Sequence, residues 1–178
     1  MNVVGQVAVT QAFLPLLRQS TGRVVFMGSI SGRMATPFLA PYCASKFALE
    51  AIADALRVEL APWHVHVALI EPGSIATPIW RKSEASAEAM RDTFRTVAGV
   101  DYSAALDAMR EAAAATGARG ESASLVADAV LHAVDSRSPK TRYVVGRDAR
   151  IQAMLARIVP DRLRDRLVSK ALKLPRVR

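Results

Sequence analysis

A tyrosine and a lysine stand four residues apart in the segment "PYCASK", where Tyr42 and Lys46 open a long apolar stretch. If that stretch is helical, the two side chains are about one turn apart and lie on the same face. An ammonium group beside a phenol favours the phenolate and lowers a tyrosine pKa from about 10 towards neutrality. The pair could therefore serve as a general acid and base. A half-buried tyrosine beside a solvated lysine is the competing interpretation.

Other reactive side chains offer less. Cys43 is the only cysteine, which excludes an internal disulfide and fits a reducing compartment. With no histidine near it in the sequence, Cys43 is predicted to be a small packing residue. The run "GSISG" has Ile30 where a serine-hydrolase elbow needs serine, so that pattern fails. His64 and His66 alternate on one face of an expected strand, and no further ligands can be placed, so we predict no metal site.

The elements that must position these residues follow from hydrophobic patterning. Continuous apolar runs bounded by turn residues predict buried parallel strands at "RVVFMGS", "HVHVALIEPGS" and "TRYVVG". Helices are expected at residues 2–18, 42–61, 79–116, 122–135, 148–158 and 161–173. Strands that alternate with helices predict an α/β fold with a parallel sheet. Ligands of such sheets bind beyond the carboxyl ends of the strands, where Ser29 and Ser31 follow the first strand and Pro72 to Thr77 follow the second.

Charge is concentrated at one end of the 178-residue chain. The net charge is +8 and 51% of the residues are hydrophobic, which is enough for one domain with a core. Residues 1–146 carry a net +1, whereas residues 147–178 carry ten Lys or Arg against three Asp, a net +7. The basic character thus belongs to a tail and argues against a nucleic-acid-binding domain. The sequence has neither a signal-peptide pattern nor an apolar run of 18 residues.

Taken together, the motifs resemble the short-chain dehydrogenase/reductase family, in particular its hydroxysteroid and retinol dehydrogenases. Ser29 lies thirteen residues before Tyr42, and Lys46 four after it, as in the family's Ser…Tyr-x-x-x-Lys arrangement. Asn2 resembles the family's fourth catalytic residue, on the helix before the first strand. The segment from Pro72 to Thr77, "PGSIAT", is similar to the family's Pro-Gly-x-Ile-x-Thr.

The resemblance implies an NAD- or NADP-dependent oxidoreductase. It implies that Tyr42 exchanges a proton with the substrate oxygen and that Ser29 holds this oxygen by a hydrogen bond. Lys46 is implied to activate Tyr42 and bind the nicotinamide ribose, and Asn2 to order a water beside Lys46. The residues expected to hold the cofactor are Tyr42, Lys46, Pro72, Gly73, Ile75 and Thr77. Ser29 and Thr77 could instead only satisfy backbone groups at element ends.

The family's Thr-Gly-x-x-x-Gly-x-Gly fingerprint does not occur in the 178 residues, and "TGARGES" at 116–122 has the wrong spacing and context. We therefore expect the C-terminal part of a Rossmann-like, doubly wound parallel sheet with three strands and a helical C-terminal tail. The expected domains are a truncated dehydrogenase domain at 1–146 and a basic amphipathic tail at 147–178. On this expectation the chain alone is incomplete for cofactor binding, and a bare strand edge results.

Three parts of the chain indicate what it could bind: residues 79–116, the helices at 2–18 and 42–61, and the C-terminal tail. Residues 79–116 stand in the place of the family's substrate loop, and their apolar side chains suit a hydrophobic alcohol or ketone such as a steroid, retinoid or lipid. The loop residues that carry this expectation are Ile79, Trp80, Met90, Phe94, Val97, Val100, Leu106 and Met109. A homo-oligomer is expected through helices 2–18 and 42–61. The tail suits peripheral contact with anionic lipid in an otherwise cytoplasmic protein, or docking on the domain or on a dimer partner.

A second function class stays open from the sequence. The chain could be a degenerate, non-catalytic dehydrogenase fragment that serves as a dimerisation or membrane-surface module. The missing phosphate-binding turn favours this alternative, whereas the intact Ser29, Tyr42 and Lys46 favour an enzyme.

Overall fold

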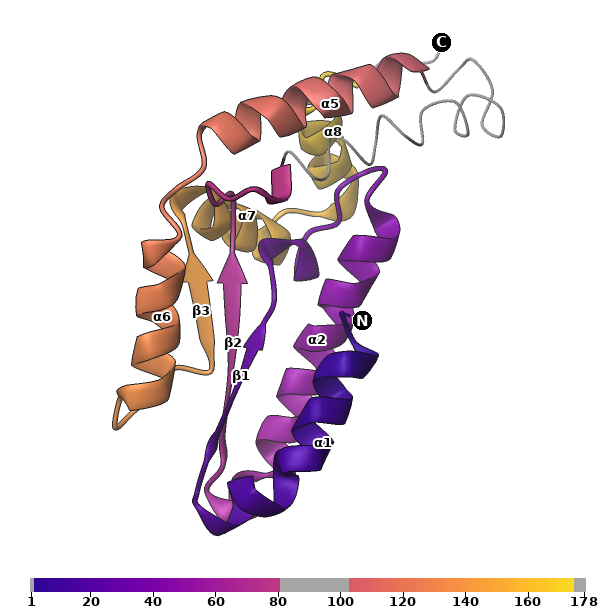
Figure 1. Ribbon diagram of the computed structural model, residues 1–178. Coiled ribbons are helices and arrows are strands. Elements are labelled where there is room, and N and C mark those ends of the chain that lie inside the picture. The colour runs from indigo at the N-terminus through magenta and orange to yellow at the C-terminus, as the bar shows by residue number, and fades with distance from the viewer. Residues whose placement is uncertain (1, 81–102, 175–178) are drawn as a thin grey trace. The chain divides into compact units, whose positions relative to one another are not determined.

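The structure, a computed structural model, describes residues 2–80 and 103–174 (Figure 1). The chain divides into two compact units. The first consists of Met1–Gly73 with Ser124–Arg157, and the second of Ser74–Ala123 with Ile158–Arg178.

A parallel sheet forms the centre of the first unit. Its strands are β1 (Arg23–Met27), β2 (His66–Pro72) and β3 (Arg142–Val145), in the order β1-β2-β3. Phe26 pairs with Leu69, and Ile70 with Tyr143, in a register that keeps all three strands parallel. This confirms the predicted α/β class and the three predicted strands.

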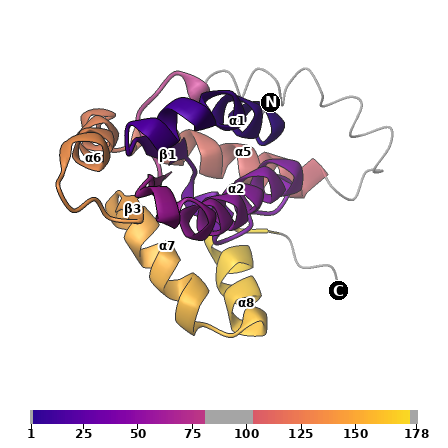
Figure 2. The ribbon, with the colours of Figure 1, turned by 90° about the horizontal axis from the view of Figure 1, so that it is seen from below.

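Helices cover both faces of this sheet (Figure 2). The helices α1 (Val4–Gln19) and α2 (Ala40–Glu59) lie on one face, and α6 (Ser124–Asp135) lies on the other. Alternate residues of β2 enter two separate hydrophobic clusters. Val67 and Leu69 join the cluster that includes Leu49 of α2, while Ala68 and Ile70 join the one that includes Ala133 of α6. Burial on both faces explains why the strand reads as a continuous apolar run.

One predicted strand begins later than expected. A short 3-10 helix, Ala61–Trp63, ends at His64, whose φ of 54° lies in the left-handed region. His64 is therefore a turn residue before β2, and the prediction that His64 and His66 alternate on one strand face was wrong. The sequence pattern does not reveal this turn, because His64 stands two residues before His66 and therefore fits the alternation expected of a strand.

The helix α7 (Arg147–Ile158) follows β3 and belongs almost wholly to the first unit. Ala149 is fully buried, and a Cβ added to Gly73 would lie 2.2 Å from Asp148 Oδ1, so the start of α7 packs on the end of β2. The predicted boundary after Gly146 stays a prediction, since the compact units divide the chain differently.

In the second unit, α5 (Ser103–Ala118) occupies the later part of the helix predicted at 79–116, and residues 81–102 lie outside the described residues. Ile75 forms an isolated parallel bridge with Glu121, and Trp80 Nε1 donates to the carbonyl of Ile75 at 2.7 Å. The helix α8 (Asp161–Ala171) is the last described. Across the described stretches, no helix combines the length and apolar character that a membrane span requires.

Candidate active site

Tyr42 and Lys46 lie in the first two turns of α2, where the sequence places them. Pro41 stands in the first turn of α2, a position that needs no backbone donor, so the helix can begin directly before Tyr42. The Nζ atom of Lys46 lies 5.7 Å from the centroid of the Tyr42 ring. Tyr42 is 37% exposed, whereas Lys46 is only 9% exposed. The structure thus brings together an accessible phenol and a buried ammonium group on one helix face.

The burial of Lys46 has an electrostatic consequence. Desolvation lowers the pKa of the Lys46 ammonium from its usual value, because a buried positive charge loses its hydration. Its Nζ atom donates a hydrogen bond to the carbonyl oxygen of Met27, the last residue of β1, at 2.9 Å. This bond fixes the amine end of Lys46 at the carboxyl end of the sheet, and with it the turn that carries Tyr42.

Ser29 lies in the loop that leaves β1. It is 9% exposed, and its Oγ accepts a hydrogen bond from the backbone N–H of Ser31 at 3.1 Å. Ser29 thereby caps a 3-10 turn, Ile30–Gly32, that the sequence pattern did not predict. A Cβ added to Gly32 would lie 2.9 Å from the carbonyl oxygen of Lys46, so this turn packs directly on the backbone of α2. In Figure 1 the loop after β1 and the start of α2 lie at the same end of the sheet.

Asn2 contacts Ser45, which lies between Tyr42 and Lys46 on α2. Its Nδ2 donates to Ser45 Oγ at 3.4 Å, and its backbone oxygen accepts from Gln6 Nε2 at 2.7 Å. Ser45 Oγ in turn donates to the carbonyl of Tyr42 at 2.6 Å. Asn2 is therefore tied to the turn between Tyr42 and Lys46, and its water-ordering role stays a prediction.

The predicted cofactor segment runs across the division between the units. Pro72 ends β2 in the first unit, and the N–H of Gly73 donates to the carbonyl of Val145 at 2.9 Å. Ile75 and Thr77 belong to the second unit, where Ile75 is buried and Thr77 half-buried. Their roles as cofactor contacts stay predictions.

Sequence reasoning missed a network of charged side chains around the buried Glu71, which reaches α2 one turn beyond Lys46. Glu71 of β2 is fully buried, and Arg33 donates to it through Nε at 3.0 Å. Arg142 of β3 donates to Glu50 Oε2 at 3.0 Å and to Asp54 Oδ1 at 2.6 Å. Burial and the neighbouring Glu50 raise the pKa of Glu71 to about 8. The available signal was a glutamate inside an apolar strand. A buried carboxylate is costly unless other groups pair with it or it binds a proton, so such a glutamate predicts buried partners.

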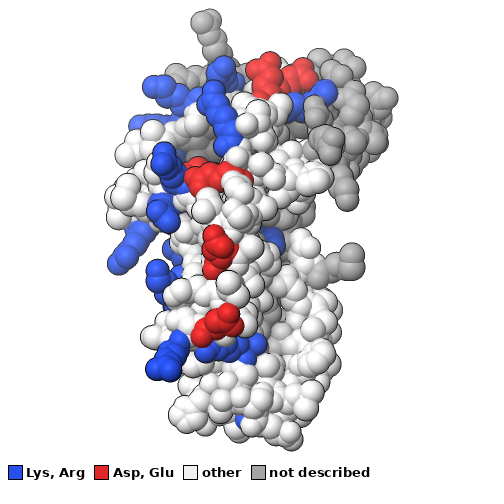
Figure 3. Space-filling view, turned by 60° about the vertical axis from the view of Figure 1, so that its left-hand side comes forward, with Lys and Arg blue, Asp and Glu red and all other residues white. Residues whose placement is uncertain are grey.

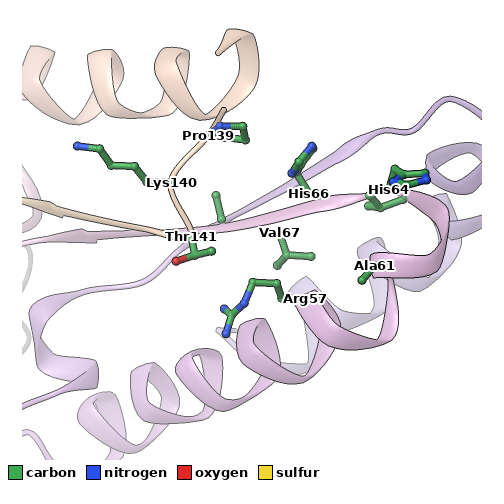
Figure 4. Close-up of a pocket in the computed structure, with 10 residues that line it drawn as sticks. Arg57, Ala61, His64, His66, Val67, Pro139, Lys140 and Thr141 are labelled. Carbon is green, nitrogen blue, oxygen red and sulfur yellow. The ribbon is translucent and has the colours of Figure 1, made fainter. Parts of the chain in front are cut away.

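A hollow in the first unit is not lined by Tyr42, Lys46 or Ser29. It has a volume of about 230 Å³ and is lined by the end of α2, the start of β2 and the segment before β3 (Figure 4). Its basic side chains do not converge, because His66 and Arg57 emerge on opposite sides of the strand in Figure 4. Arg57 is also paired with Asp54 at 2.7 Å. Among the residues that the structure describes, no cluster of three or more His, Cys, Asp or Glu could hold a metal ion.

The donor set of the site fits one half of a nicotinamide dinucleotide. A phenol, a buried ammonium and a serine hydroxyl can bind a carbonyl or alcohol oxygen and the hydroxyls of a ribose. The pyrophosphate half calls for a glycine-rich turn at a helix N-terminus, and the 178 residues contain no Thr-Gly-x-x-x-Gly-x-Gly sequence.

Comparisons with known proteins agree with this arrangement. A family model described as short chain dehydrogenase matches residues 1–88. Mouse mitochondrial D-beta-hydroxybutyrate dehydrogenase is 40% identical over 149 residues, which cover 80% of this chain and 43% of the mouse protein. Mouse retinol dehydrogenase 5 is 35% identical over 185 residues, which cover 98% of this chain and 56% of that protein. A crystal structure of a short chain dehydrogenase from Burkholderia cenocepacia in complex with NADP matches with a TM-score of 0.64 and 25% identity, over 93% of this chain and 57% of that one.

The chain belongs to the short-chain dehydrogenase family, and its three-stranded sheet is part of the Rossmann-like fold of these proteins. It spans about half the length of the curated relatives it matches, 43% and 56% in the two mouse proteins.

Proposed function

We propose that this chain carries the catalytic part of an NAD- or NADP-dependent oxidoreductase that interconverts a hydrophobic alcohol and its ketone or aldehyde. The observation that carries the proposal is the pair at the start of α2, where the buried ammonium of Lys46 lies 5.7 Å from the ring of an accessible tyrosine, Tyr42. The names of the relatives, which include a retinol dehydrogenase and a hydroxybutyrate dehydrogenase, support an alcohol or ketone as the substrate class.

Each residue has one task in this proposal. Tyr42 takes the hydroxyl proton when the substrate is an alcohol, and gives a proton to the oxygen when the substrate is a carbonyl compound. Lys46 lies on the same face of α2, with its Nζ atom 5.7 Å from the Tyr42 ring centroid, and positions the cofactor ribose beside the phenol. Ser29 donates a hydrogen bond to the same substrate oxygen and stabilises the charge that develops on it. Asn2 orders a water molecule beside Lys46, through which the proton reaches solvent.

The cofactor would be held by this chain through its ribose and nicotinamide. A bound nicotinamide supplies the acceptor or donor of the hydride that accompanies the proton moved by Tyr42. Tyr42 and Lys46 would contact the ribose, while Pro72, Gly73, Ile75 and Thr77 would contact the nicotinamide. The apolar composition of 79–116 in the sequence favours a steroid, retinoid or lipid-like molecule as the substrate.

The test replaces the proton-transfer group alone. The chain is joined behind the glycine-rich nucleotide-binding segment of a family member, and Tyr42→Phe is introduced into this chimera. We expect turnover, followed by nicotinamide absorbance with a panel of steroid and retinoid alcohols, to fall by about 10²- to 10⁴-fold, because the phenol is the general acid and base.

Tyr143→Phe is the matched control. The Tyr143 hydroxyl contacts His132 Nδ1 at 2.9 Å on the α6 side of the sheet, so its removal should leave turnover within about twofold once folding is verified. Unchanged turnover in the Tyr42→Phe chimera would end the catalytic assignment and favour the non-catalytic module.

Two exposed apolar surfaces favour association as a second role of the chain. On α1, the side chains of Val9, Phe13 and Leu16 are 61%, 56% and 60% exposed. These three residues share one face of the helix at spacings of four and three, as an interface between helices requires. We propose that α1 and α2 form a homo-oligomer contact.

The C-terminal helices α7 and α8 each expose apolar side chains of their own. Ile151, Met154 and Ile158 are exposed on α7, as are Leu163 and Leu167 on α8, and basic residues flank them. In Figure 3, Lys and Arg side chains are blue, and fewer Asp and Glu side chains lie among them in red. We propose peripheral contact of residues 147–178 with anionic lipid, since apolar residues flanked by Arg and Lys suit such a surface.

A further inference from the structure

The carboxyl groups of Glu71 and Glu50 lie near each other, and Glu50 stands one helical turn beyond Lys46 on α2. Neither group has a role in the proposed chemistry. Glu71 is fully buried on β2, and the Glu50 side chain on α2 is 14% exposed. Both approach the same nitrogen, Arg142 Nε, at 3.6 Å from Glu71 Oε1 and 3.0 Å from Glu50 Oε2. Two carboxylates this close in a buried site repel each other, so both are rarely ionised at once.

One oxygen of each carboxyl group lacks a hydrogen bond. Within the described part of the chain, no hydrogen bond reaches Glu50 Oε1 or Glu71 Oε2, although both atoms are buried. Arg33 Nη2 lies 2.8 Å from Glu71 Oε2 as an ion pair but without hydrogen-bond geometry. A proton on one of the two carboxyl groups supplies a donor where the buried oxygens have none.

The pair joins the elements that carry the candidate catalytic residues. Glu50 is one turn beyond Lys46 on α2, and Arg33 directly follows the 3-10 turn that Ser29 caps. A Cβ added to Gly32 would lie 3.2 Å from Glu50 Cγ, so the turn also packs on the stem of this glutamate. Through Arg33 and Glu50, the single residue Glu71 therefore contacts both the loop of Ser29 and the helix of Lys46.

We propose that Glu71 and Glu50 form a positioning pair that holds one proton between them and fixes the loop of Ser29 against the helix of Lys46. The charged groups that face the pair are Arg33 from the loop, Arg142 from β3 and, through Arg142, Asp54 from α2. The importance of this positioning for catalysis rests on the proposed function, whereas the pair itself does not.

The proton makes the stability of the fold depend on pH in a defined direction. Burial and Glu50 raise the pKa of Glu71 from 4.5 to about 8, so between these values the folded chain holds a proton that the unfolded chain releases. Stability from this group is complete below pH 4.5 and is lost as the pH rises to about 8.

The experiment compares the 178-residue chain with its Glu71→Gln variant in urea unfolding at pH 5 to 8.5. A glutamine has the shape of a protonated glutamate but no proton to lose. We expect the parent midpoint to fall across this range and the variant midpoint to stay level, with the two equal near pH 5. A variant midpoint below the parent by the same amount at every pH would mean that Glu71 is ionised, and would overturn the proposal.

Asp54→Asn is the matched control, because Asp54 also pairs with Arg142 but has a pKa that Arg142 lowers. Its removal should shift the midpoint by a constant amount over pH 5 to 8.5 and keep the slope of the parent. Loss of the slope in Asp54→Asn would assign the pH dependence to the whole network and refute the specific role of Glu71.

Hydrogen exchange tests the positioning itself without any redox assay. Glu71→Ala should raise backbone exchange at residues 28–34 by at least about tenfold at pH 6, and Glu71→Gln should restore protection. Equal protection in all three proteins would refute the positioning role while leaving the proposed redox function untouched.

Discussion

At the residue scale, two neighbouring serines differ in what their hydroxyl groups can do. Ser29 Oγ is buried in the loop after β1 and accepts from the N–H of Ser31, a bond that does not use its own O–H. Ser31 takes part in that bond through its backbone, which a change of its side chain leaves in place. The Ser29 hydroxyl therefore has a proposed role in binding the substrate oxygen, whereas the Ser31 hydroxyl has none and can serve as a control.

Ser29→Ala in the chimera should lower kcat by about 10²-fold, because it removes a donor aimed at charge that develops on the substrate oxygen. Ser31→Ala should leave kcat within about twofold. Steady-state rates of nicotinamide absorbance change measure both, with urea midpoints to verify folding. Equal losses in the two variants would contradict the role of Ser29.

The sequence was sufficient to predict which side chains lie close together when the residues are only a few positions apart. Tyr42 and Lys46 share a helix turn, and their proximity follows from four residues of separation. Glu71 could not be assigned in this way, because Arg33 is 38 residues away and its approach depends on how the loop after β1 folds onto β2. The 3-10 turn that brings Arg33 to Glu71 is too short to show an apolar periodicity in the sequence, so the sequence does not predict it.

At the element scale, the helices were predictable because their interior faces repeat. The expected helix at 42–61 is observed as Ala40–Glu59, and Leu49 and Ala53 on its inner face are buried. Periodicity does not tell which further apolar residues face solvent. Val9, Phe13 and Leu16 on α1 would be taken for core residues from their type alone, yet all three are more than half exposed.

Phe13→Glu should shift the chain towards monomer if α1 forms the proposed homo-oligomer contact, since a charge buried in an apolar interface lacks a partner. Sedimentation velocity at several concentrations measures this change, and we expect the dissociation constant to rise by at least about tenfold. Gln11→Glu places the same charge on the opposite face of α1 and should leave the constant unchanged. An equal effect of both variants would indicate nonspecific charge repulsion instead.

At the scale of the whole molecule, the basic region of the sequence coincides with helices that expose apolar side chains. Residues 147–178 hold a net +7, and their two helices expose apolar side chains between the basic ones. Truncation after Gly146 is a poor test of membrane contact, because Ala149 is fully buried and its removal would disturb the first unit. Substitutions on the exposed face avoid this problem.

Flotation with phosphatidylserine-containing vesicles tests the lipid contact. Ile151 and Met154 are 56% and 55% exposed, and replacing both by Asn should lower the vesicle partition coefficient by about tenfold or more through lost apolar burial. Leu131→Asn with Val134→Asn, on the exposed side of α6, serves as the control and should leave binding unchanged. Similar losses in both double variants would argue against a specific surface on α7.

The link from Arg142 to Glu50 spans 92 residues and has a consequence for how the chain is made. On the ribosome, Glu50 emerges long before the Arg142 guanidinium that pairs with it, because translation proceeds at about 5–20 residues per second. We expect nascent chains arrested before β3 to remain protease-sensitive, and the first unit to close only when its last strand has left the exit tunnel.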